Sequence, residues 1–168
     1  MPAGIGGRAG VAGGNGLERI DCAVTRRIVG LDINPAYLEA VRRRFAVLPG
    51  LELHCVDLGA QVVDVVPVRL VHAALIFEHA GTGRCLEHAV RMVGEGGRMS
   101  VVLQLQGREE DVAPTPYASI QALREGFRLV EPEWLCGNLR ERGLRMEREE
   151  RRELRGGKGF WMGVFGRR

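Results

Sequence analysis

The sequence predicts an α/β fold built on a doubly wound, mostly parallel sheet. Apolar runs typical of buried strands alternate with helical segments along most of the 168 residues. Two of these runs end on an acid, Asp32 and Asp57, as expected for parallel strands that finish at one edge of a sheet. Near the C-terminus, two strand-like segments flank Gly156 and Gly157, which predicts an antiparallel hairpin. No repeat or linker interrupts the pattern, so we expect one domain over residues 1–168.

The first strand is the poorest match to this pattern. Residues 1–9 place Ile5 among glycines and small residues. A parallel strand buried on both faces is instead a run of Val, Ile and Leu. We therefore expect a frayed or incomplete first strand.

A glycine-rich turn follows, made of Gly13, Gly14, Asn15 and Gly16. Glycine allows positive φ angles and a close approach of the backbone to a ligand. Beyond it there is room for only a short helix, which Asn15 would cap. The next apolar run predicts a strand that ends at Asp32, where a carboxylate can accept the hydroxyls of a ribose. The pattern indicates a nucleoside-containing cofactor.

Asn34 and Pro35 begin the most regular helix, because asparagine caps a helix and proline is tolerated at its first position. Apolar residues then recur at helical spacing until a Pro-Gly pair ends the helix. Residues 51–56 alternate like a strand and lead to Asp57. Residues 59–66 fit either a short helix or a loop.

The middle of the chain predicts two more strands with a helix between them. The apolar run 68–77 is typical of a buried strand. Thr82 is placed to cap the next helix, and Gly94 is placed to end it. Residues 99–103 form the following strand.

The C-terminal third begins with the polar segment 106–118, which we expect to be a loop over the edge of the sheet. Residues 119–127 and 132–142 have helical spacing. A strand is expected from Leu144, continuing through the Glu and Arg residues that follow. It would pair with residues 160–165.

Composition limits the partners and the location. The 24 Lys and Arg residues and 21 Asp and Glu residues give a net charge of +3, with both signs interleaved, so a nucleic-acid partner is disfavoured. The four cysteines form no close pair, as is typical of reduced thiols. No apolar run reaches the roughly 20 residues of a membrane span, and the N-terminus lacks a signal-peptide pattern. We expect a cytoplasmic protein.

Several motifs occur together in one order. They are GVAGGNG, GLDINPAYLEAVRRRF, HCVDL, LVHAALIFEHA, VGEGGRMSVVL and NLRERGLRM. In this order and spacing the chain resembles the class I S-adenosylmethionine-dependent methyltransferases. The resemblance implies a Rossmann-like fold of seven strands, the last one antiparallel, and S-adenosylmethionine as cofactor. Where that family commonly has an acid and a first glycine, this chain has Gly10 and Ala12.

The resemblance also implies roles for individual residues. The glycine-rich turn would approach the methionine part of the cofactor, Asp32 would accept the ribose hydroxyls, and Phe77 would lie near the sulfonium. The implied cofactor-binding residues are Gly13, Gly14, Asn15, Gly16, Asp32, Ile33, Asp57, Leu58 and Phe77. On the acceptor side, the candidate catalytic residues are His79, as a general base, and Glu78. Tyr117 is the candidate substrate-binding residue. A surface or helix-capping role for His79 and an ordinary loop position for Tyr117 stay open.

The implied reaction is methyl transfer from S-adenosylmethionine to an oxygen or nitrogen atom of a small molecule by in-line displacement. Two alternatives remain. One is a catalytically impaired methyltransferase-like domain, which the changes at Gly10 and Ala12 favour. The other is an NAD(P)-dependent oxidoreductase, which the second acid and the short chain disfavour. A homodimer is left open.

No metal site is expected. His79, Cys85 and His88 are the nearest approach to a ligand set in the sequence. A structural zinc site needs four ligands in a closed set.

Overall fold

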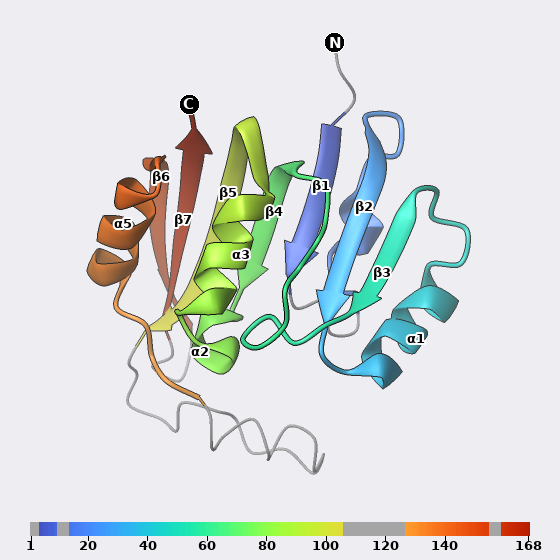
Figure 1. The fold of residues 1–168 in the computed structure, drawn as a ribbon, viewed down its shortest axis with the longest axis horizontal. Coiled ribbons are helices and arrows are strands. Elements are labelled where there is room, and N and C mark those ends of the chain that lie inside the picture. The colour runs from blue at the N-terminus through green and yellow to red at the C-terminus, as the bar shows by residue number, and fades with distance from the viewer. Residues whose placement is uncertain (1–3, 10–13, 106–126, 155–158) are drawn as a thin grey trace.

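The computed structural model describes residues 4–9, 14–105, 127–154 and 159–168. Within these residues the strands form one seven-stranded sheet in the order β3-β2-β1-β4-β5-β7-β6 (Figure 1). The strands are β1 (Gly4–Ala9), β2 (Thr25–Asp32), β3 (Leu51–Cys55), β4 (Val68–Ala74), β5 (Val93–Leu105), β6 (Leu144–Glu153) and β7 (Gly159–Arg167). The helices are η1 (Leu17–Arg19), α1 (Pro35–Arg44), α2 (Phe77–Ala80), α3 (Arg84–Met92) and α5 (Pro132–Glu141).

The strand pairing confirms the α/β Rossmann-like class. β1, β2, β3, β4 and β5 pair in parallel, whereas β7 is antiparallel to both β5 and β6. The order of the strands reverses at β1, since the chain proceeds outward to β3 and then returns to place β4 on the other side of β1. In open α/β sheets, ligands bind at the carboxyl ends of the strands next to such a reversal.

Helices cover both faces of the sheet, because side chains alternate between the two faces along each strand. On β2, Ile28 packs in a cluster with Leu17 of η1 and Val41 of α1. Its neighbours Val29 and Leu31 belong to the larger core on the other face. Figure 1 shows α3 lying across β4 and β5, and α5 beside β6, in line with their contacts.

The first strand, which the sequence led us to expect as frayed or incomplete, is formed by residues 4–9. β1 is a central strand that pairs along one edge with β2 and along the other with β4; Gly6, for example, lies opposite both Ile28 and Leu70. The physical reason is that both edges of this strand are hydrogen-bonded through the main chain, which glycine provides as well as any residue. Residues 1–3 and 10–13 lie outside the described residues.

The segment after β1 and the end of β4 differ from the expectation. Residues 16–25 contain only the single 3-10 turn η1, preceded by Gly16 at φ 91°, and Asn15 is not its cap. Asn15 instead accepts a hydrogen bond from Arg44 of α1 at 3.1 Å. β4 ends at Ala74 and not at residue 77, because Leu75 adopts a φ of 56° and the chain then turns into α2.

The helix α3, which follows α2, also begins and ends at other residues than expected. Gly83, and not Thr82, precedes α3, and α3 ends at Met92. Gly94, expected to end that helix, lies within β5. A Cβ on Gly94 would be 3.3 Å from the carbonyl oxygen of Val68, so the glycine permits close pairing with β4.

Other local predictions are confirmed. The Asn34 side chain accepts a hydrogen bond from the Ala36 amide at 2.9 Å and caps α1. The charged run after Leu144 continues β6 to Glu153 and pairs with β7. Trp161 of β7 is buried yet donates from its indole nitrogen to Glu149 at 2.7 Å, which joins the two strands of the hairpin.

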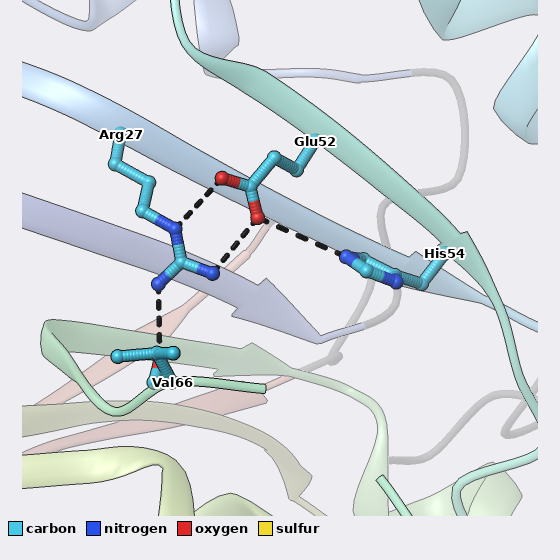
Figure 2. Close-up of polar contacts among 4 residues, drawn as sticks. All are labelled: Arg27, Glu52, His54 and Val66. Atoms are coloured by element: carbon cyan, nitrogen blue, oxygen red, sulfur yellow. Dashed lines mark hydrogen bonds and ion pairs between the residues drawn. The ribbon is translucent and has the colours of Figure 1, made fainter. Parts of the chain in front are cut away.

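The connection between β3 and β4 is a loop without a helix, held by Arg27. The Arg27 Nε and Nη2 atoms each donate to Glu52 at 2.8 Å, and Nη1 donates to the Val66 carbonyl at 3.0 Å (Figure 2). His54 lies next in this group, with its Nε2 atom 3.9 Å from Glu52. One guanidinium therefore fixes the loop to β2 and β3 at once.

No helix in the described part of the chain is long and apolar enough to cross a membrane.

Replacing Arg27 with Met is expected to lower the free energy of unfolding by about 1 kcal/mol, because the substitution removes the charged hydrogen bonds that hold the loop. Urea unfolding followed by tryptophan fluorescence measures the change. Arg42→Met is the matched control, since Arg42 pairs with Glu39 on the exposed surface of α1. Equal loss in both variants would contradict the role of the Val66 contact.

Gly50→Ala is expected to destabilise the protein by roughly 2–4 kcal/mol, because the site combines a strained backbone angle with a steric clash. Gly50 has a φ of +71°, and a Cβ there would be 2.0 Å from the Arg26 carbonyl oxygen. Gly137→Ala within α5 is the control, because none of the described atoms outside its own helix turn lies within 4 Å of where a Cβ would stand. That variant is expected to gain up to about 1 kcal/mol from helix propensity. Thermal unfolding of both variants tests the pair, and similar melting temperatures would refute it.

Candidate functional site

A cavity of about 770 Å³ lies at the carboxyl ends of β2, β3 and β4. Its volume is in the range of small-molecule and cofactor sites. Three connections supply its walls, one after each of these strands. The lining residues are Asp32, Ile33, Asn34, Tyr37, Val56, Asp57, Leu58, Gly59, Ala74, Leu75, Ile76, His79 and Ala80.

The first wall follows β2. Asp32 is the last residue of that strand, and its Oδ1 atom accepts a hydrogen bond from the Asn34 amide at 2.9 Å. Its main-chain oxygen accepts from the Val56 amide at 2.9 Å, which ties the ends of β2 and β3 together. Ile33 is 61% exposed and offers the cavity an apolar surface. This wall therefore combines a carboxylate with an apolar face.

The second wall follows β3 and contains Asp57 and Leu58. The Asp57 Oδ1 atom accepts from the Gly59 amide at 2.8 Å, and its own amide donates to Gln61 at 2.7 Å. Leu58 is buried, and its carbonyl accepts a hydrogen bond from the ring of His88 at 3.1 Å. These bonds hold a second carboxylate in the lining of the same cavity.

The third wall follows β4 and contains His79. His79 lines the cavity, and its imidazole contacts the ring of Phe127, with the two ring centroids 5.1 Å apart. Leu75, Ile76 and Ala80 add apolar surface beside it. The only titratable group that this wall brings to the cavity, among the described residues, is thus an imidazole.

Of the predicted site residues, Asp32, Ile33, Asp57, Leu58 and His79 line the cavity. The structure brings these five together from three connections. Gly13 and Tyr117 lie outside the described residues.

Gly14, Asn15 and Gly16 do not line the cavity. Gly14 has a φ of 76°, and a Cβ there would lie 2.7 Å from the Phe45 ring and 3.2 Å from Val41. A glycine at this position is therefore required by its packing against α1. Asn15, the next residue, also contacts this helix, since it accepts a hydrogen bond from Arg44.

Phe77 and Glu78 are in the core and do not line the cavity either. Each is 1% exposed. The Glu78 Oε1 atom accepts a hydrogen bond from the Gln104 amide at 2.8 Å, and burial raises the pKa of the carboxyl above its ordinary value. Glu78 was expected beside the acceptor. In the structure its side chain lies in the core and does not line the cavity.

Tyr37 and Asn34 complete the first wall and were not predicted as site residues. The signal for them was available in the sequence. Asn34 is the cap and Tyr37 lies in the first turn of the helix that follows a strand-end acid, so both are close to the ends of the strands.

The arrangement does not resemble a metal site. Among the described residues, no three His, Cys, Asp or Glu side chains lie close enough together to hold an ion. The His88 ring donates to the Leu58 carbonyl. Burial, with a smaller contribution from the charge of Asp57, raises the pKa of the Cys85 thiol to about 12, so this cysteine is protonated at neutral pH.

Comparison with known proteins gives a uniform result at the level of fold. No family model matches the sequence, and no curated protein matches it significantly. Many solved structures are similar. The N-methyltransferase NodS from Bradyrhizobium japonicum WM9, in complex with S-adenosyl-L-homocysteine, is 15% identical, with a TM-score of 0.74 over 98% of this chain and 78% of that chain.

Two further structures show the same likeness. Magnesium protoporphyrin IX methyltransferase (ChlM) from Synechocystis PCC 6803, with bound S-adenosylhomocysteine, is 12% identical, with a TM-score of 0.71 over 99% of this chain and 75% of that chain. The [4+2]-cyclase SpnF is 13% identical, with a TM-score of 0.75 over 98% and 74%. Since one of these proteins is named for another reaction, the likeness identifies the fold and leaves the reaction to the site. The chain has the fold of the class I S-adenosylmethionine-dependent methyltransferases.

Proposed function

We propose that this protein transfers the methyl group of S-adenosylmethionine to an oxygen or nitrogen atom of a small molecule. The observation that supports this proposal best is the pair Asp32 and Asp57, which stand at the ends of adjacent parallel strands in one cavity. A nucleoside needs a carboxylate for its ribose and a polar group at its base edge. The two acids meet both needs.

The residues that are present fit the cofactor. Asp32 would accept the ribose hydroxyls, and each such charged hydrogen bond contributes about 1.5–3 kcal/mol. The exposed side chain of Ile33 would pack on the adenine, and Asp57, with Leu58 beside it, would meet the adenine edge. NodS and ChlM, which share the fold, are both seen with S-adenosylhomocysteine, in support of this assignment.

When bound, S-adenosylmethionine supplies a methyl group on a positively charged sulfur. The chain contributes alignment, because holding the acceptor in near-attack geometry accounts for most of the rate of such a displacement. Leu75, Ile76 and Ala80 give the third wall an apolar surface. His79, in the same wall, would take the proton that an oxygen or nitrogen acceptor loses.

Other roles stay predictions. Contact of Gly13, Gly14, Asn15 and Gly16 with the methionine part is proposed from the resemblance, as is a role for Tyr117 on the acceptor. The cytoplasmic location and the homodimer are also predictions.

Asp32→Ala is expected to weaken the binding of S-adenosylhomocysteine by about 100-fold, the equivalent of roughly 3 kcal/mol for two lost hydrogen bonds. Isothermal titration calorimetry measures the dissociation constant. Asp64→Ala is the matched control, because Asp64 is exposed on the β3–β4 connection and does not line the cavity. NAD serves as the competing ligand. Binding of NAD, or of neither ligand by the folded protein, would overturn the proposal and favour the oxidoreductase or the impaired domain.

His79→Ala is expected to lower kcat by about 10²–10³, as is typical for loss of a general base, while binding of S-adenosylhomocysteine changes less than threefold. The assay follows transfer of a radiolabelled methyl group to phenol, catechol and amine acceptors. His54→Ala is the control, since His54 is on the surface of β3 outside the cavity. Unchanged kcat in His79→Ala would exclude a base at this position.

A further inference from the structure

The short helix α2 carries His79 into the wall of the cavity, although it has only four residues. One helical turn is not stable by itself. Its position must therefore be set by contacts with the rest of the fold. Phe77 and Glu78, both 1% exposed, are the residues through which α2 enters the core.

Glu78 makes two contacts with separate parts of the chain. Its Oε1 atom accepts from the Gln104 amide near the end of β5, at 2.8 Å. Its main-chain oxygen accepts from the Arg128 amide at 2.9 Å, in the segment that leads to α5. A single residue thus joins β5, α2 and the approach to α5.

The Glu78 side chain takes the place of a main-chain hydrogen bond between β4 and β5 that is missing beyond the end of β4. β4 and β5 pair as far as Ala74 opposite Val102, and the Leu75 amide donates to the Val102 carbonyl. β4 then turns away. The next main-chain donor of β5 on that side is the Gln104 amide, and the Glu78 carboxyl accepts from it where a strand residue would otherwise do so.

An apolar side chain of the same size would fill this position at lower cost. Burial of a carboxyl is unfavourable unless it is hydrogen-bonded. Among the described residues the Glu78 Oε2 atom makes no hydrogen bond. Burial remains the largest effect on the pKa of this carboxyl, so the value of the group lies in the geometry that it imposes and not in net stability.

That geometry concerns the acceptor side of the cavity. His79 follows Glu78, and Phe127 precedes Arg128, so the two main-chain segments held by Glu78 carry the two rings that contact each other at 5.1 Å. We infer that Glu78 is a positioning residue, which fixes the His79 imidazole in the cavity wall through hydrogen bonds to β5 and to the approach of α5. Its bearing on methyl transfer rests on the proposed function, whereas the arrangement of the rings does not.

Two substitutions of similar volume separate this role from others. Glu78→Gln keeps an oxygen acceptor for the Gln104 amide. Glu78→Met fills the same space and removes the acceptor. Because it also removes a buried carboxyl, Glu78→Met is expected to fold and to be at least as stable as the natural protein. Leu86→Ala, in the same core but with no part in these hydrogen bonds, is the control for general destabilisation.

The first measurement is amide hydrogen exchange by NMR, with the ring resonances of His79. In Glu78→Met, the Gln104 amide is expected to exchange at least tenfold faster, with the Met99 amide unchanged, and the His79 resonances to move toward solvent-exposed values. In Glu78→Gln both stay close to the natural protein. Retained Gln104 protection and unchanged His79 resonances in Glu78→Met would overturn the inference, as would equal loss in Leu86→Ala.

The second measurement uses the ligand and the methyl-transfer assay. All three variants are expected to bind S-adenosylhomocysteine within threefold of the natural protein. With an acceptor in hand, kcat is expected to fall about tenfold in Glu78→Met and to recover in Glu78→Gln. Equal loss in both would instead make Glu78 a catalytic residue and refute the inference. If the natural protein binds no S-adenosylhomocysteine, the proposed function fails, and the NMR comparison still decides the role of Glu78.

Discussion

The pairing of β1 with both β2 and β4 is the constraint on which the rest of the structure depends. This strand joins two halves of the sheet that the chain builds in opposite directions. The connections after β2 and β4 leave the sheet on either side of β1, and the cavity lies where they separate. Without the central ladder the two acids and the imidazole would belong to unconnected parts of the chain.

Each wall of the cavity is held by a few directed hydrogen bonds. The carboxylates of Asp32 and Asp57 each accept from an amide two residues farther along the chain, which fixes their orientation locally. The third wall depends on longer connections, through Glu78 to β5 and to the approach of α5. The walls after β2 and β3 are thus determined by local turns, and the wall after β4 by tertiary contacts.

This difference bears on the diversity of the fold. NodS, ChlM and SpnF share the architecture at 12–15% identity, and one of the three is named as a cyclase. A parallel sheet whose strand order reverses supplies a cofactor-sized cavity whatever the reaction. Under the proposed function, differences in chemistry would come from the side chains of the third wall, of which His79 is the titratable one among the described residues.

Local features of the fold and of the site were predicted by the sequence alone. The α/β class follows from the alternation of apolar runs and helical spacing, and the cap at Asn34 and the strand-end acids follow from chemistry within a few residues. Asp32, Ile33, Asp57, Leu58 and His79, which the family resemblance and the strand-end pattern indicated, all line the cavity. They lie at the end of a strand or in the connection that follows it, and the ends of parallel strands meet at one edge.

What only the tertiary structure decided depends on partners far away in the chain. Glycine-rich β1 is a central strand because its neighbours hydrogen-bond its main chain on both edges, which no apolar pattern reports. Gly14 is needed for close packing against Phe45 of the α1 region and does not line the cavity. Glu78, which the motif placed beside the acceptor, is directed instead toward β5, because β4 ends early and leaves the Gln104 amide to be satisfied. Sequence determines which groups are available and their local turns, whereas the direction of a buried side chain depends on the donors that the completed sheet presents to it.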